Sequence, residues 1–144
     1  MKKLCLLFLL LPFAFGVKAQ FKIVNTATID LLNLRSDTWP INLQRVTKES
    51  DTCYVLVFRS QEYINEVIMK TLRFRNLEQL KYFQKGLSTL KNGSTGDVAE
   101  FQEYTIKRVD KKKEGSWYTL SFDGGITNFQ QPEADKMIAV INTL

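Results

Sequence analysis

Histidine is absent from all 144 residues of this chain, and its absence excludes several kinds of chemistry. The commonest general base and the commonest protein ligand of zinc are missing, so serine–histidine and cysteine–histidine nucleophiles are ruled out. Calcium loops need acids at alternating positions around a glycine, whereas Asp97, Glu100 and Glu103 are too sparse and Asp123 is alone beside Gly124. We therefore expect no metal site, no cofactor and no assembled catalytic residues.

Cysteine is almost as scarce, with two in the chain. Cys5 lies in the apolar run at the start of the sequence, which leaves Cys53 alone in the remainder and excludes an intrachain disulfide there. A lone cysteine in a β-run is usually a small buried apolar residue, and this is what we expect of Cys53. The alternative is a disulfide between two chains.

Long apolar runs are missing beyond the first twenty residues. Residues 4–15 form an apolar run of about a dozen residues, against about 20 for a membrane-spanning helix. Lys2 and Lys3 precede it, and Val17 and Ala19 occupy the −3 and −1 positions of a small-residue cleavage site. This order predicts a signal peptide over residues 1–19, with an uncleaved anchor as the alternative, and a single exported domain over residues 20–144, secreted or periplasmic.

Cleavage would change the charge of the chain. The full sequence has 20 Lys and Arg against 15 Asp and Glu, a net charge of +5. Lys2, Lys3 and Lys18 leave with the signal peptide, which lowers the basic count to 17 and the net charge to +2. A strongly basic domain would indicate nucleic acid or an anionic membrane, whereas a nearly balanced one indicates neither. We expect no nucleic-acid partner and no integral membrane span.

The sequence contains an internal repeat, in which residues 41–91 correspond to residues 98–144. An apolar-x-Arg-Val run at 43–46 recurs at 106–109, and the Tyr-x-Leu-x-Phe alternation beginning at Tyr54 recurs at Tyr118. Each half then continues through a further short strand into a closing helix. The repeated unit is therefore predicted to be strand-strand-strand-helix.

Alternating and helical periodicities define an α+β fold. Helices are predicted at 77–90, capped by Asn76, and from Pro132 to the end of the chain. A short helix beginning at Thr28 is expected over residues 28–34. We predict one antiparallel sheet of about six strands with both helices packed on it; the strands are 43–46, 53–58, 67–74, 100–110, 116–123 and 126–129.

The element order over residues 41–144 is similar to the plan of the PUR-repeat nucleic-acid binders, in which a unit of several antiparallel strands and one helix is repeated. The resemblance is one of plan, and no diagnostic motif of that family is matched. It implies a sheet with a functional open face. Export and the low net charge of the mature chain argue against a nucleic-acid role.

The sheet face opposite the helices is the candidate binding surface. It is too apolar across several strands to remain fully in contact with water, so the N-terminal segment, a second copy of the chain or a ligand is expected to cover part of it. Two arginines edge this face, and Lys81 and Lys85 follow on the next helix. The predicted partner-binding residues are Val55, Val57, Met69, Arg73, Arg75, Trp117 and Thr119.

These observations favour an exported, non-catalytic binding or protein-interaction module of the cell envelope or secreted fraction. Its expected partner is a second copy of itself or another envelope protein. One alternative is an anion- or lipid-binding protein that uses the basic rim of the first repeat. The other is a hydrolase that works with carboxylates alone, for which Asp123 with Glu133, or Glu100 with Glu103, are the candidate pairs.

Overall fold

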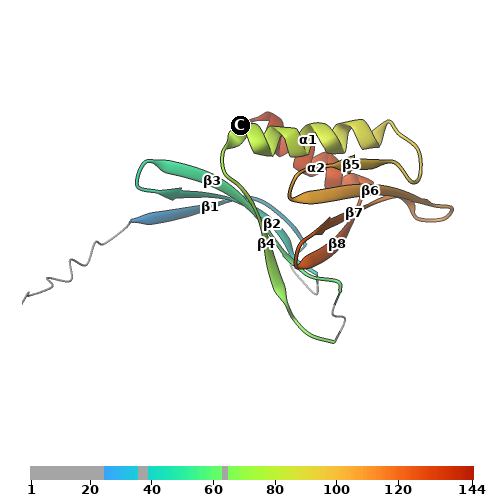
Figure 1. Ribbon diagram of the computed structural model, residues 1–144, viewed down its shortest axis with the longest axis horizontal. Helices are drawn as coiled ribbons and strands as arrows, with labels where there is room; N and C mark the ends of the chain where they lie inside the picture. The colour runs from blue at the N-terminus through green and yellow to red at the C-terminus, as the bar shows by residue number, and fades with distance from the viewer. Residues whose placement is uncertain (1–24, 36–38, 63–64) are drawn as a thin grey trace, which may run out of the picture.

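The computed structural model describes residues 25–35, 39–62 and 65–144 (Figure 1). The predicted signal peptide lies outside these residues. The described part is α+β, with two antiparallel four-stranded sheets and two helices. The first sheet, sheet A, has the order β1 (Thr26–Arg35), β2 (Ile41–Lys48), β3 (Asp51–Arg59) and β4 (Met69–Phe74), and helix α1 (Leu77–Lys91) follows it. The second, sheet B, has the order β5 (Val98–Glu100), β6 (Tyr104–Lys111), β7 (Gly115–Phe122) and β8 (Gly125–Gln130), and helix α2 (Gln131–Asn142) follows it.

The predicted single sheet of about six strands is wrong, because strands β4 and β5 do not pair. Each is an edge strand of its own sheet, and helix α1 separates them in sequence. The two sheets instead meet at the loop after β3, where the Gln61 backbone N–H donates to the Ile126 carbonyl of edge strand β8 at 2.7 Å. Ser60, fully buried in this loop, accepts a longer contact of 3.4 Å from the Ile126 N–H.

The predicted strand-strand-strand-helix unit also needs correction, since four strands precede each helix. Residues expected to form a short helix from Thr28 belong instead to β1, which pairs along β2 with two register shifts. In the second half, the strand predicted at 100–110 is divided into β5 and β6 by a turn at residues 101–103. Strand β5 is only three residues long, which is too short for an alternating pattern to show in sequence.

The two halves correspond in register as well as in element order. Arg45 lies opposite Tyr54 in sheet A, and Arg108 lies opposite Tyr118 in sheet B. Two residues further along the ladder, Leu43 faces Leu56 just as Ile106 faces Leu120; all four are at most 2% exposed. The repeated sequence pattern therefore marks equivalent positions in two separate sheets. It does not mark neighbouring strands of a single sheet.

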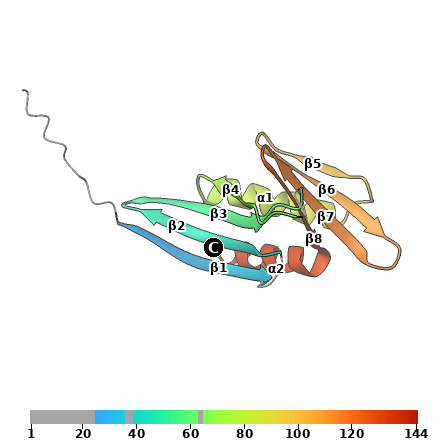
Figure 2. The same ribbon diagram turned by 90° about the horizontal axis from the view of Figure 1, so that it is seen from below.

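Both helices lie side by side against one side of the sheets (Figure 1), and the view from below shows the strands on the side away from them (Figure 2). Asn76 caps α1 as predicted, with its side chain accepting from the Gln79 N–H at 2.9 Å. Pro132 lies in the first turn of α2, where its missing N–H costs no hydrogen bond. Neither helix in the described part of the chain has the length and apolar character that crossing a membrane requires.

A single hydrophobic core fills the space between the inner sheet faces and the helices. Phe58 of sheet A meets Phe122 of sheet B edge to face at 5.6 Å between ring centroids. Phe74, Phe83 and Tyr104, from β4, α1 and β6, form a second aromatic cluster across the same boundary. Because these rings come from both halves, neither half can bury its apolar face alone.

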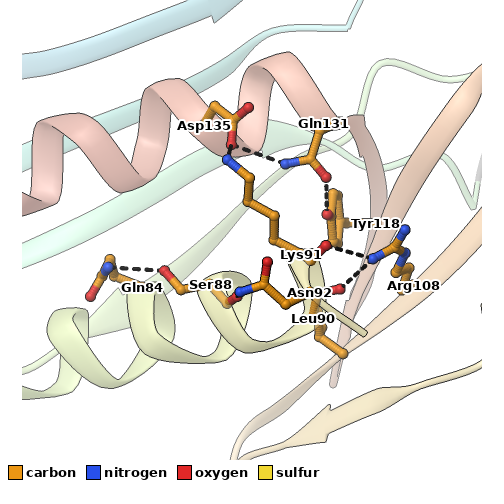
Figure 3. Close-up of polar contacts among 9 residues, drawn as sticks. All are labelled: Gln84, Ser88, Leu90, Lys91, Asn92, Arg108, Tyr118, Gln131 and Asp135. Atoms are coloured by element: carbon orange, nitrogen blue, oxygen red, sulfur yellow. Dashed lines mark hydrogen bonds and ion pairs between the residues drawn. The ribbon is translucent and has the colours of Figure 1, made fainter. Parts of the chain in front are cut away.

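Arg108 joins the end of α1 to sheet B (Figure 3). Its Nη1 donates to the carbonyls of Leu90 and Lys91 at 2.8 and 2.7 Å, in the last turn of the helix. The Leu90 carbonyl also accepts from the Gly93 N–H at 3.1 Å. The same guanidinium donates to Asp110 at 2.8 Å and to Ser116 at 3.0 Å. A cation at this end also interacts favourably with the helix dipole.

Arg108→Ala should lower the free energy of unfolding by about 2 kcal/mol, because it removes the hydrogen bonds that join the end of α1 to sheet B in a half-buried setting. Arg45→Ala is the matched control: Arg45 occupies the equivalent register position, and no hydrogen bond or ion pair joins it to another residue that the structure describes. Urea unfolding of both variants measures the difference. Equal losses would show that Arg108 does not act through the end of α1.

Candidate functional site

The predicted binding face lies on the side of the sheets away from the helices, but it is divided between them. Val55, Val57, Met69 and Arg73 belong to β3 and β4 of sheet A, with Arg75 directly after β4. Trp117 and Thr119 belong to β7 of sheet B. The structure therefore presents two separate surfaces where we expected one, each with a hollow of its own.

The sheet A hollow measures about 1140 Å³ and brings Val55, Arg73 and Arg75 together. Val57 and Met69 do not line it. Its charges are mixed, because Lys48 lies opposite Asp51 in the ladder and Arg75 forms an exposed ion pair with Glu103 at 3.4 Å. Cys53 also lines this hollow; it is a half-buried free thiol, whereas we expected full burial.

The centre of this face needs less cover than the sequence implied. Val55 is only 9% exposed, whereas Met69, on edge strand β4, is 45% exposed. The neighbours of Val55 across the ladder are Gln44 and Arg73, whose long side chains can shield an apolar centre while their polar ends stay in water. The N-terminal residues that were expected to cover the face form β1 from Thr26 onward and widen the sheet instead; residues 20–24 lie outside the described part.

The basic rim of the first repeat does not form one surface. Lys81 and Lys85 line a shallow depression on the exposed side of α1, around Tyr82. Arg75, in the sheet A hollow, is part of a different surface and is paired with Glu103. The basic side chains that we grouped in the sequence therefore lie on two different surfaces of the protein.

The candidate carboxylate pairs have structural roles or stand apart. Glu133 accepts from the Gln130 N–H at 2.7 Å and so caps the start of α2. Glu103 is the ion-pair partner of Arg75, and Asp123 is exposed in the turn between β7 and β8. Among the described residues, no group of three or more acidic or cysteine side chains is placed to hold a metal ion.

A polar network between the helices and sheet B also lacks the features of a reaction centre (Figure 3). Lys91 of α1 donates to Asp135 of α2 at 2.7 Å, and Gln131 links Asp135 to the hydroxyl of Tyr118. The hydrogen bond from Lys91 lowers the pKa of Asp135, and burial raises the pKa of Tyr118. Both groups therefore keep their ordinary neutral-pH forms, and the network serves to join the helices.

The second hollow is the better candidate site, and we call it the two-tryptophan hollow. It measures about 480 Å³, within the range of roughly 300–1,000 Å³ that is typical of small-molecule sites. Both tryptophans of the chain line it. Its lining residues are Trp39, Gln61, Val109, Lys111, Trp117, Thr119 and Asn128.

Three half-buried polar side chains are joined within this hollow. Thr119 on β7 and Asn128 on β8 lie directly opposite each other, and the threonine hydroxyl donates to Asn128 Oδ1 at 2.6 Å. The amide nitrogen of Asn128 then donates to Gln61 Oε1. Gln61 is placed there by the backbone hydrogen bond that joins the two sheets, so the polar row depends on the sheet boundary.

A cation stacks on each indole ring. Lys111 Nζ lies 4.2 Å from the centroid of Trp117, and the Arg59 guanidinium carbon lies 4.2 Å from that of Trp39. The Lys111 ammonium is also 3.0 Å from Glu114, so its charge is paired. The indole nitrogen of Trp117 is buried and has no acceptor among the residues that the structure describes.

Sequence reasoning identified Trp117 and Thr119 but missed the other polar and aromatic residues here. Trp39 precedes β2, Gln61 follows β3 and Asn128 lies on β8, so no local pattern connects them. The only signal was that Trp39 is the other tryptophan and lies outside the helical stripes. No protein-family model matches the sequence, and no curated protein matches it either.

Asp135→Asn should destabilise the protein more near pH 7 than near pH 3. The folded-state pKa of Asp135 is lowered, so its ionised form contributes stability above the ordinary aspartate range, and this contribution disappears as the pH falls through the lowered pKa. Urea unfolding at the two pH values tests this, with Asp123→Asn in the exposed turn as the control. A loss that does not depend on pH would contradict the assignment.

Iodide should quench the tryptophan fluorescence more strongly than caesium does, because each indole has a cation beside it. In a Trp39→Phe background, which isolates Trp117, Lys111→Ala should reduce the preference for iodide. Lys113→Ala is the control, since Lys113 is exposed on the same hairpin turn. Equal quenching by both ions, before and after the substitution, would show that Lys111 does not lie over the ring in solution.

Proposed function

We propose that this chain is an exported, non-catalytic binding module, and that its ligand occupies the two-tryptophan hollow. The observation that carries the proposal is the gathering of both tryptophans of the chain around a row of three half-buried polar side chains. Aromatic surface with a few convergent polar groups is the usual composition of a ligand site. The leader-like sequence of residues 1–19 supports export.

The absence of histidine supports a binding role over a catalytic one. The four acids considered for a hydrolase lie at a helix cap, in an ion pair, in an exposed turn and at the exposed end of edge strand β5. A carboxylate mechanism needs two acids facing each other across a cleft, and none of these acids lines the two-tryptophan hollow. Binding of an anion through the basic rim has less support, because the rim is divided between two surfaces.

The test is a fragment screen by NMR on the exported protein, purified after expression with its own leader. The spectrum contains indole N–H signals from two tryptophans only, so it reports directly on the hollow. We expect a subset of small polar fragments to shift both signals, and Asn128→Ala to abolish those shifts. Ser121→Ala is the control, because Ser121 lies on β7 two residues beyond Thr119 but does not line the hollow.

Two results would overturn the proposal. One is that no fragment shifts either indole signal, or that fragments bind only elsewhere. The other is a stable dimer, seen by light scattering, in which both indoles are protected from quenchers; the hollow would then be an interface between two copies of the chain. Mass analysis of the same sample checks the leader, since cleavage before Gln20 is expected.

A further inference from the structure

The two ends of the polar row in the two-tryptophan hollow have opposite hydrogen-bonding character. The Thr119 hydroxyl uses its only proton on Asn128, so its oxygen retains accepting capacity. At the other end, Gln61 accepts from Asn128 through Oε1, which leaves the two hydrogens on its Nε2 as donors. Neither group has a further partner among the described residues. The row therefore offers one acceptor and one donor to a ligand.

The walls of the hollow suit a flat apolar surface. Trp39 and Trp117 provide large planar rings, and Val109, directly opposite Trp117 in the ladder, adds an aliphatic side chain. Indole rings bury much apolar area at a small cost in side-chain entropy. A ligand that packs on the apolar walls and also bonds to the polar row must combine an apolar face with polar groups at its edge.

The charge of the hollow favours a neutral ligand. Among the described residues that line it, Lys111 is the only charged one, and the Lys111 ammonium is paired with Glu114 at 3.0 Å. An anionic ligand would have to compete with this carboxylate, while a cationic ligand would find no acid among the lining residues that the structure describes. Neutral molecules meet neither obstacle.

We propose that the ligand is a neutral oligosaccharide of pyranose rings, an inference that rests on the binding function proposed above. One face of a pyranose ring with equatorial hydroxyls carries only C–H groups and packs on an indole. Two adjacent hydroxyls at its edge act as donor and acceptor together, the first donating to Thr119 Oγ1 and the second accepting from Gln61 Nε2. A proline-rich peptide also packs on aromatic side chains, but its proline residues have no N–H and their backbone carbonyls only accept hydrogen bonds, which leaves Thr119 without a donor.

The experiment compares three probes on the exported protein: cellotetraose, decaproline and inorganic phosphate. Binding is followed by the two indole N–H signals and quantified by titration. Cellotetraose should shift both signals with an affinity that changes little between low and high salt, because no unpaired charge takes part. Decaproline and phosphate should leave both signals in place.

Conservative variants test each contact. Thr119→Val keeps the shape of the side chain and removes the acceptor, so it should weaken cellotetraose binding about tenfold. Gln61→Ala should have a similar effect from the other end of the row. Ser121→Ala should leave binding unchanged, because Ser121 does not line the hollow. Retained wild-type unfolding profiles confirm that the variants fold.

The outcomes separate the failure of this inference from that of the proposed function. If decaproline or phosphate shifts the indole signals and cellotetraose does not, the hollow binds a ligand but the assignment to a glycan is wrong. If Thr119→Val and Gln61→Ala bind cellotetraose as the wild type does, the proposed hydrogen bonds are wrong. If neither these probes nor the fragments shift the signals, both proposals fail.

Discussion

The junction between the two sheets is the constraint on which the rest of the structure depends. It consists of the backbone hydrogen bond from Gln61 to Ile126 and of the edge-to-face contact between Phe58 and Phe122 directly behind it. On the inner side, the junction lets both sheets share one core beneath the two helices. On the outer side, it brings the loop after β3 against β8, and this contact creates the two-tryptophan hollow. Fold and candidate site therefore have a common origin.

The polar side chains at this junction are of two kinds: one is buried with its hydrogen bonds made inside the protein, and the others are half-buried with hydrogen-bonding groups to spare. Ser60 is fully buried and its hydroxyl is used within the protein, as buried polar groups normally are. Thr119 and Gln61, which line the neighbouring hollow, are only half-buried. Each keeps a hydrogen-bonding group that no described residue uses. Fixed geometry combined with unused capacity is what a binding site requires, because the ligand then meets groups that are already in place.

Much of the fold followed from local patterns. Helix α1 was predicted from its apolar stripe and from Asn76, because capping depends on residues three or four positions apart. The repeated Arg-Val and Tyr-x-Leu-x-Phe patterns located equivalent positions of both sheets, since alternation reflects which strand face is buried. The same patterns failed to show that the strands form two sheets. Alternation says which way a side chain points, but it does not say which strand lies next to β4 or β5.

For the candidate site, the sequence by itself determined that Trp117 and Thr119 lie away from the core, because they share the parity opposite to Tyr118 and Leu120. It also showed that these 144 residues contain no histidine for a histidine-dependent nucleophile. Only the tertiary structure decided that Trp39, Gln61 and Asn128 join them. These three residues come from a segment before β2, a loop after β3 and an edge strand in the other half of the chain. These residues come together only because the two sheets pack on a shared core. No spacing between residues along the chain encodes that packing.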